Sequence, residues 1–109
     1  MSTNNFSKSQ VVQLKNQVQY QTGSIVSRIV VKRAGGNLTL FAFDKGQFLS
    51  EHTAAFDAVI QILEGEAEIV IGGEPFHLKE NDTIIMPANI PHAVNALEQF
   101  KMLLTLVKD

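Results

Sequence analysis

The sequence predicts an all-β domain in which about eight short antiparallel strands form a sandwich or a barrel. Runs rich in β-branched and aromatic residues recur along the chain, and clusters of Gly, Asn and Asp separate them at near-regular intervals. A parallel βαβ arrangement would need helical segments between the strands, and the sequence has no helical periodicity there. The 109 residues are enough for one core, so we expect residues 1–109 to form a single domain.

The N-terminal third combines a polar start with two expected strands. Residues 1–7 are mostly polar and are expected to be disordered, as polar chain termini usually are. Apolar residues at helical spacing in SQVVQLKNQ, residues 9–17, indicate a short amphipathic turn. Strands are expected over residues 24–32 and 38–43, because both runs favour extended structure and the turn sequence Ala34–Asn37 lies between them.

The rest of the chain contains five further expected strands and the clearest hairpin signal. Gly72 and Gly73 stand between two apolar runs, and glycine readily adopts the positive φ that a two-residue hairpin turn requires. The run TIIM is apolar on both faces, which indicates a buried strand that ends at Pro87. The five strands are expected over residues 58–63, 67–71, 74–78, 83–87 and 100–108.

Several of the expected strands, most clearly 24–32 and 38–43, carry apolar residues on both faces. An antiparallel sheet that faces water on one side should be polar on that side. The apolar outer faces therefore indicate that a second sheet or a second subunit covers them. A jelly roll provides a second sheet that covers one face of the first. A second subunit would cover the other face, so we also expect a homodimer.

The composition argues against several classes of function. The net charge is −2 and the nine Lys and Arg are scattered, so no nucleic-acid partner is expected. The chain has no cysteine, which excludes disulfides, thiolate catalysis and thiolate metal ligands. No run approaches the roughly 18 apolar residues of a membrane span, and the polar N-terminus lacks a signal region. We therefore expect no membrane partner and a cytoplasmic location.

Two stretches of the chain share a pattern of Gly, His and Pro. The first contains Gly46, His52 and Gly65, and the second contains Pro87 and His92. Their spacing resembles the two motifs of the cupin superfamily, whose members are small β-barrels that often hold a metal ion inside. The resemblance implies an antiparallel double-stranded β-helix, the jelly-roll barrel of that family.

Residues 46–96 carry both motifs, but some positions depart from the family pattern. Asn81 and Asn89 stand where the family has glycine, and asparagine is the residue that best tolerates a left-handed backbone after glycine. The turns at these positions are therefore expected to persist. Three further departures place alanine where metal-binding members have His, Glu or Asn: Ala54, Ala58 and Ala96.

The resemblance places His52 and His92 inside the barrel and implies that they bind a divalent transition metal such as Zn, Ni, Mn or Fe. Two imidazoles are fewer than the three or four protein ligands of most zinc sites, and iron sites with two histidines add a carboxylate. The family's carboxylate position is Ala58, so waters or a bound ligand would have to complete the site. The alternative is that both histidines are partly buried, hydrogen-bonded residues at the mouth of a pocket.

An apolar pocket is the second expectation for the interior. Strand alternation, together with the resemblance, places Ile60 inside and Gln61 outside, and alternation also places His77 outside. Alanine in place of His or Glu leaves room for a small ligand. The residues expected to line the pocket are Ala54, Ala58, Ile60, Met86, Val94, Ala96, Phe41, Phe43, Phe48 and Met102. The alternative for the aromatic and methionine side chains is that they form the core.

Three classes of function remain open from the sequence. The first is an enzyme with a reduced metal site that acts on a small molecule through His52 and His92. The second is a metal-free barrel that binds or senses a small molecule without catalysis. The third is an interaction module whose apolar outer sheet matters more than its interior.

Overall fold

The computed structural model describes residues 6–108, which form nine β-strands and one short 3-10 helix. The elements are η1 (Leu14–Asn16), β1 (Ile25–Arg33), β2 (Gly36–Phe43), β3 (Phe48–His52), β4 (Ala58–Glu64), β5 (Glu66–Ile71), β6 (Glu74–Lys79), β7 (Thr83–Met86), β8 (His92–Ala96) and β9 (Phe100–Val107). All seven expected strands are present, and β3 and β8 are additional. Within the described residues, no helix is long and apolar enough to cross a membrane.

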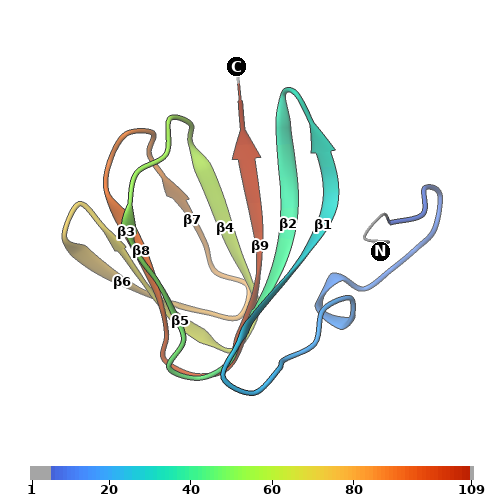
Figure 1. Ribbon diagram of the computed structural model, residues 1–109, viewed down its shortest axis with the longest axis horizontal. Helices are drawn as coiled ribbons and strands as arrows, with labels where there is room; N and C mark the ends of the chain where they lie inside the picture. The colour runs from blue at the N-terminus through green and yellow to red at the C-terminus, as the bar shows by residue number, and fades with distance from the viewer. Residues whose placement is uncertain (1–5, 109) are drawn as a thin grey trace.

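The strands form two antiparallel sheets that face each other. One sheet has the order β1-β2-β9-β4-β7 and the other the order β3-β8-β5-β6. The sheets converge at the lower end of Figure 1 and diverge at its upper end, where the β3–β4 and β7–β8 connections lie. The all-β jelly-roll prediction is therefore confirmed.

The two sheets of the jelly roll do not close into a continuous barrel, because no strand pair joins them within residues 6–108. The strands β3 and β7 lie at sheet edges and are only five and four residues long. Short edge strands cannot continue the hydrogen-bond ladder across diverging sheets, and a barrel requires that continuity.

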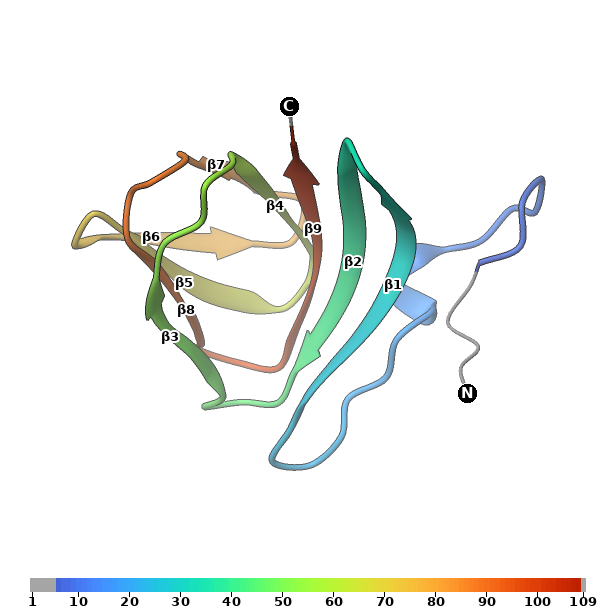
Figure 2. The same ribbon diagram turned by 45° about the horizontal axis from the view of Figure 1, so that its top comes forward.

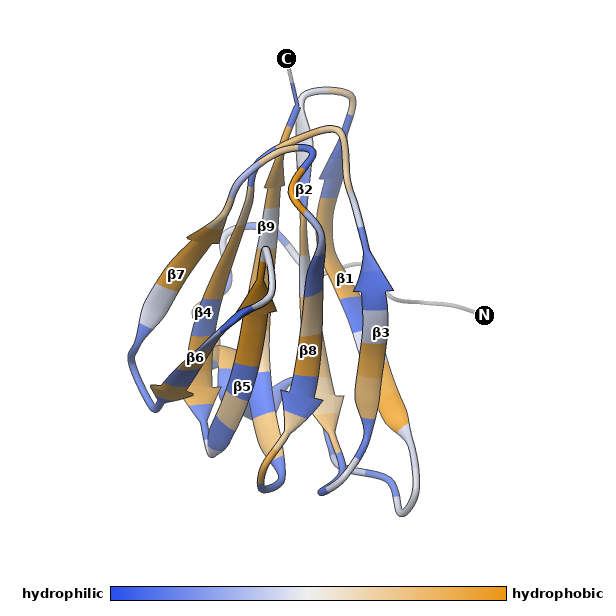
Figure 3. Cartoon of the chain, turned by 90° about the vertical axis from the view of Figure 1, so that its left-hand side faces the viewer, coloured by the Kyte–Doolittle hydropathy of each residue, from blue (hydrophilic) through white to orange (hydrophobic). Residues whose placement is uncertain are grey.

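The main core lies between the inner faces of the sheets. Strand alternation along β4 buries Ile60 and Ile62, which are both 0% exposed, whereas Gln61 faces outward as expected. The rings of Phe43 and Phe100 stack with centroids 4.5 Å apart at the converging end. Burial alternates along β8, where His92, Val94 and Ala96 are buried, and Figure 3 shows apolar and polar segments along the strands of this sheet.

The tight turns have the backbone that the sequence predicts. Gly72 and Gly73 have φ of 58° and 84° and form the two-residue connection between β5 and β6. Asn81 and Asn89 have φ of 73° and 66°. Both asparagines therefore hold the left-handed conformation expected of glycine replacements.

The outer face of the five-stranded sheet has a second apolar cluster, and the chain's own N-terminal segment covers it. Leu40, Ala42 and Leu103 of the sheet are buried together with Val18, and Leu14 packs against this cluster. Figures 1 and 2 show the segment running past the outer side of β1. The apolar outer residues of the strands are thus explained in large part without a second subunit.

A polar network holds this N-terminal segment against the sheet. The Tyr20 hydroxyl donates a hydrogen bond of 2.6 Å to the Glu64 carboxylate. The ammonium group of Lys101, a residue only 6% exposed, donates to the backbone carbonyl of Lys15 at 2.6 Å and lies 3.9 Å from Glu64. Burial, followed by the Glu64 contact, raises the pKa of Tyr20 above its usual range, so the phenol stays protonated as the donor.

The N-terminal expectations are met only in part. The amphipathic turn expected over residues 9–17 is reduced to the 3-10 helix η1, and Val11, one of the apolar residues at helical spacing, is 98% exposed. Of residues 1–7, which were expected to be disordered, 1–5 lie outside the described residues. Phe6 has a defined place, with the Arg28 guanidinium 4.2 Å from its ring centroid.

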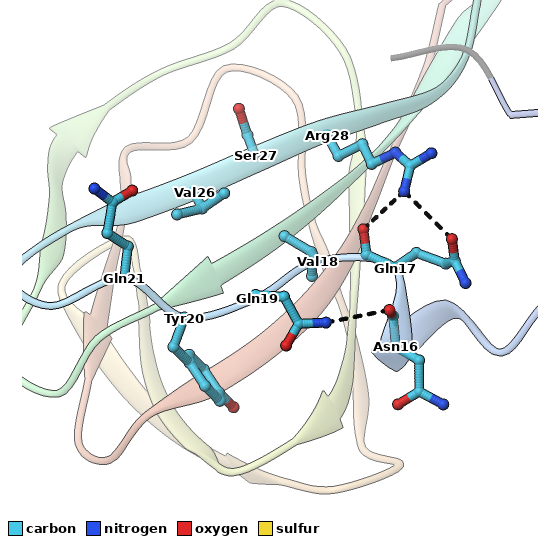
Figure 4. Close-up of a pocket in the computed structure, with 9 residues that line it drawn as sticks. All are labelled: Asn16, Gln17, Val18, Gln19, Tyr20, Gln21, Val26, Ser27 and Arg28. Carbon is cyan, nitrogen blue, oxygen red and sulfur yellow. Dashed lines mark hydrogen bonds between the residues drawn. The ribbon is translucent and has the colours of Figure 1, made fainter. Parts of the chain in front are cut away.

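A surface groove of about 640 Å³ separates the N-terminal segment from β1 (Figure 4). Arg28 crosses it and donates from Nη1 to the backbone carbonyl and the side-chain oxygen of Gln17, at 3.1 and 3.3 Å. Gln19 donates to the backbone carbonyl of Asn16 at 3.3 Å. These hydrogen bonds hold the N-terminal segment against β1, so we assign the groove a structural role.

Candidate functional site

A cavity of about 200 Å³ lies between the sheets and is lined by side chains from both. Its walls include residues near the upper ends of the strands in Figure 1, among them His52 at the end of β3, Met86 at the end of β7 and His92 at the start of β8. The complete lining is Leu49, His52, Ala54, Ala58, Ile60, Met86, His92, Val94, Met102, Leu104 and Leu106. The two histidines are the polar side chains in this set, and the remainder is apolar.

The structure places most of the residues predicted from the sequence on this cavity. Both histidines line it, together with six of the ten predicted pocket residues: Ala54, Ala58, Ile60, Met86, Val94 and Met102. The alanines at positions 54 and 58 contribute small side chains to the cavity wall. Ala96 is buried at 6% exposure but does not line the cavity.

The three phenylalanines predicted for the pocket lie elsewhere. Phe43 is a fully buried core residue stacked on Phe100, and Phe41 is partly buried and packs against the same core. Phe48 is 61% exposed, so its assignment to the pocket is wrong. Side chains alternate along β3, and Leu49, the neighbour of Phe48, points into the cavity instead.

Sequence reasoning missed three of the lining residues: Leu49, Leu104 and Leu106. The sequence does contain a signal for the two leucines of β9, because strand alternation puts them on the same face as Met102, a predicted pocket residue. Leu49 and its neighbour Phe48 are both apolar, so the sequence alone does not show which of them faces inward. The pairing of β3 with β8 decides it.

The side chains of His52 and His92, called the His pair below, come together across adjacent strands. The two residues are register partners between β3 and β8, after an irregularity in the pairing that begins at Leu49. Their ring centroids are 4.4 Å apart and the ring planes meet at 70°. His92 is only 4% exposed, whereas His52 is exposed, so the pair reaches from the interior to solvent.

Backbone carbonyls orient both rings of the His pair. Nδ1 of His52 lies 2.8 Å from the carbonyl oxygen of Ser50, and Nδ1 of His92 lies 3.2 Å from that of Ile90. A carbonyl oxygen only accepts, so each Nδ1 carries the proton. Each Nε2 then has a free lone pair when its ring is neutral. Histidines that bind metals have this arrangement, in which the second nitrogen donates to a carbonyl or a carboxylate.

Burial lowers the pKa of His92 below its ordinary value near 6.5. The hydrogen bond to the Ile90 carbonyl favours the protonated ring and opposes this effect, and the nearby His52 lowers the pKa further. His92 is therefore neutral at pH 7, which is the form that can accept a hydrogen bond or bind a cation.

Two other candidate ligand side chains, His77 and Asp57, have partners away from the His pair. Within residues 6–108 no cluster of three His, Cys, Asp or Glu side chains has the geometry to hold a metal ion. His77 faces outward as expected, with Nε2 2.8 Å from the Glu66 carboxylate. Asp57, the carboxylate next to Ala58 in the sequence, is exposed and accepts a hydrogen bond from the Ala88 amide at 2.8 Å.

Comparison with known proteins supports the assignment suggested by the two motifs. A family model described as a cupin domain matches residues 39–107. A solved structure of a conserved protein of unknown function from Streptococcus pyogenes is 42% identical, with a TM-score of 0.92, and the match covers 100% of this chain and 96% of that chain. A cupin superfamily protein from Desulfitobacterium hafniense is 26% identical with a TM-score of 0.90, and the match covers 96% of each chain.

A third solved structure is a cupin 2 conserved barrel domain protein from Leptotrichia buccalis. It is 43% identical with a TM-score of 0.84, and the match covers 86% of this chain but 46% of that chain. No curated protein matches the sequence. The family model spans more than half of the chain and includes the His pair and all the other residues that line the cavity. The chain therefore belongs to the cupin family.

Proposed function

We propose that the protein binds a small molecule in the cavity between its two sheets, with the His pair holding the ligand's polar group. The observation that carries the proposal is the composition of the cavity wall, where His52 and His92 stand among nine apolar side chains. Apolar walls with a few polar groups that fix orientation are typical of small-molecule sites. Because His52 is exposed, the cavity has a polar side that faces solvent.

A divalent metal on the His pair is the second candidate, and one observation favours it. Both Nδ1 atoms are bonded to carbonyls, so both Nε2 atoms are free to bind a cation. His52 and His92 would hold Zn, Ni, Mn or Fe, and the bound ion would act as a Lewis acid that polarises an oxygen of the small molecule. Two protein ligands make a weak site, so the affinity should be modest.

We expect the replacement of His52 by alanine to abolish any metal uptake while leaving the melting temperature of the metal-free protein nearly unchanged. His52 is exposed, so its removal opens no cavity in the core. Metal content after incubation with Zn, Ni, Mn or Fe(II) measures the first effect, and a thermal melt after chelation measures the second. His77→Ala is the matched control, because His77 is exposed and outside the cavity.

A wild-type protein that takes up none of the four metals would eliminate the metal candidate and leave the metal-free binding site. Equal uptake by the wild type and His52→Ala would show that the metal binds elsewhere. Saturable binding of single-ring compounds to the chelated protein tests the small-molecule site directly, through a rise in melting temperature with ligand concentration.

We also propose that the protein is a homodimer. The N-terminal segment leaves Ile29 and Val31 each 39% exposed on β1, which is an edge strand of its sheet. An exposed apolar edge favours pairing with another chain. Light scattering is expected to give twice the chain mass of 12.0 kDa, and Val31→Lys should shift the mass toward the monomer. A mass near 12.0 kDa for the wild type at micromolar concentration would rule the dimer out.

A further inference from the structure

We propose that the ligand of this cavity carries a hydrogen-bond donor, a hydroxyl or amine group, on an apolar body no larger than about one substituted ring. The inference rests on the proposed small-molecule function in its metal-free form. It goes further by specifying the chemistry of the head group and the size of the body.

The head group follows from the orientation of the two rings. A neutral imidazole has one N–H, and in each histidine the carbonyl of Ser50 or Ile90 engages it. The His pair therefore presents Nε2 lone pairs, which accept hydrogen bonds. The remaining lining side chains are hydrocarbons and two thioethers, Met86 and Met102, none of which donates a hydrogen bond. Ethers, ketones and esters would find no donor among these side chains, whereas a hydroxyl or an amine would find an acceptor.

An anionic head group fits poorly for the same reason. A carboxylate would face the Nε2 lone pairs of the His pair, and the two sets of lone pairs would repel each other. The side chains that line the cavity include neither Lys nor Arg, so no cationic group there would offset this repulsion.

The size and polarity of the body follow from the cavity. An apolar cavity of about 150 Å³ is known to hold benzene, and sites for drug-sized ligands begin at about 300 Å³. The cavity here is about 200 Å³, which suits one ring with a small substituent or a short branched chain. A sugar would bring several hydroxyl groups against apolar walls, and each buried group without a partner is unfavourable.

Phenol, toluene and benzoate form a matched set of probes for the metal-free protein. Toluene has nearly the shape of phenol but no donor, and benzoate replaces the donor with an anion. Phenol is expected to bind about three- to ten-fold more tightly than toluene, the gain of one net hydrogen bond. Toluene is the more hydrophobic of the two, so a preference for phenol must come from the head group. Isothermal titration of chelated protein gives the three dissociation constants.

Histidine ring NMR tests the underlying geometry without a substitution that could impair folding. The chain has three histidines, and His52→Ala and His77→Ala assign their signals. The ring nitrogens of His52 and His92 are expected to show a protonated Nδ1 and a free Nε2, and phenol should shift the two Nε2 signals but not that of His77. The preference for phenol over toluene should shrink in His52→Ala and persist in His77→Ala.

The outcomes separate the two levels of the proposal. Binding of toluene as tight as that of phenol, tighter binding of benzoate, or rings protonated on Nε2 would overturn the donor inference and leave the cavity as a binding site. Phenol that binds only after metal is added would overturn the metal-free form. Failure of all three probes to bind at millimolar concentration would overturn the inference together with the proposed small-molecule site.

Discussion

Replacing Ala58 by leucine should abolish binding in the cavity while the protein stays folded. Ala58 lies at the start of β4, is 3% exposed and forms part of the cavity wall, so a larger side chain at this position grows into the space that a ligand would fill. The expected result is at least about a ten-fold loss in affinity for any ligand that binds between the sheets, because the space for an apolar ring is lost. Titration with phenol measures it.

The matched control for this substitution is Ala55→Leu. Ala55 is exposed and does not line the cavity, so the same change in size should leave binding unaltered. A melting temperature near that of the wild type would show that Ala58→Leu fills space rather than disrupting packing. Undiminished phenol binding in a folded Ala58→Leu protein would place the ligand outside the cavity and contradict the proposed function.

Replacing Gly65 by alanine should destabilise the fold by at least about 3 kcal/mol, the sum of a left-handed backbone cost and a steric conflict. Gly65 connects β4 to β5 with φ of 83°. A Cβ at this position would lie 2.7 Å from Cα and Cβ of Phe100 and nearer still to the carbonyl oxygen of Gln99. Two of these three atoms belong to the backbone and cannot move aside without disturbing β9.

Gly73 is a matched control for the backbone contribution. Its φ of 84° is almost the same, but a Cβ there would meet nothing within 4 Å. Gly73→Ala should therefore cost only about 1–2 kcal/mol, the penalty of the left-handed conformation alone. Urea unfolding of both variants gives the difference. Equal losses would show that the strand junction at Gly65 relaxes and that close approach to β9 does not constrain it.

The sequence predicted the turns and the inward face of a strand because single residues decide these features. Gly72 and Gly73 marked a hairpin, since few other residues adopt two consecutive positive φ values easily. Asn81 and Asn89 kept turns that glycine makes in the family. The inward face of β4 followed from strand alternation, which fixes one face once a single position is known.

Features that depend on pairing between distant segments could not be predicted in the same way. The sequence predicts Phe48 in the pocket, but Leu49 lies there, because the face that β3 turns inward is set by its register with β8. The sequence also did not predict that Leu14 and Val18 cover the outer face of the five-stranded sheet. Those residues have only a weak helical pattern, and their burial depends on contacts with Leu40, Ala42 and Leu103, which come more than twenty residues later in the chain.

The position of β9 in its sheet constrains how the chain can fold during synthesis on the ribosome. β9 is flanked by β2 and β4, and all four other strands of that sheet are translated before it. Until β9 has emerged, β2 and β4 each have an unpaired inner edge of the kind that recruits other chains. Folding of this sheet must therefore follow translation of β9, and ribosome-stalled fragments that stop at Gln99 should be prone to aggregation and depend on chaperones.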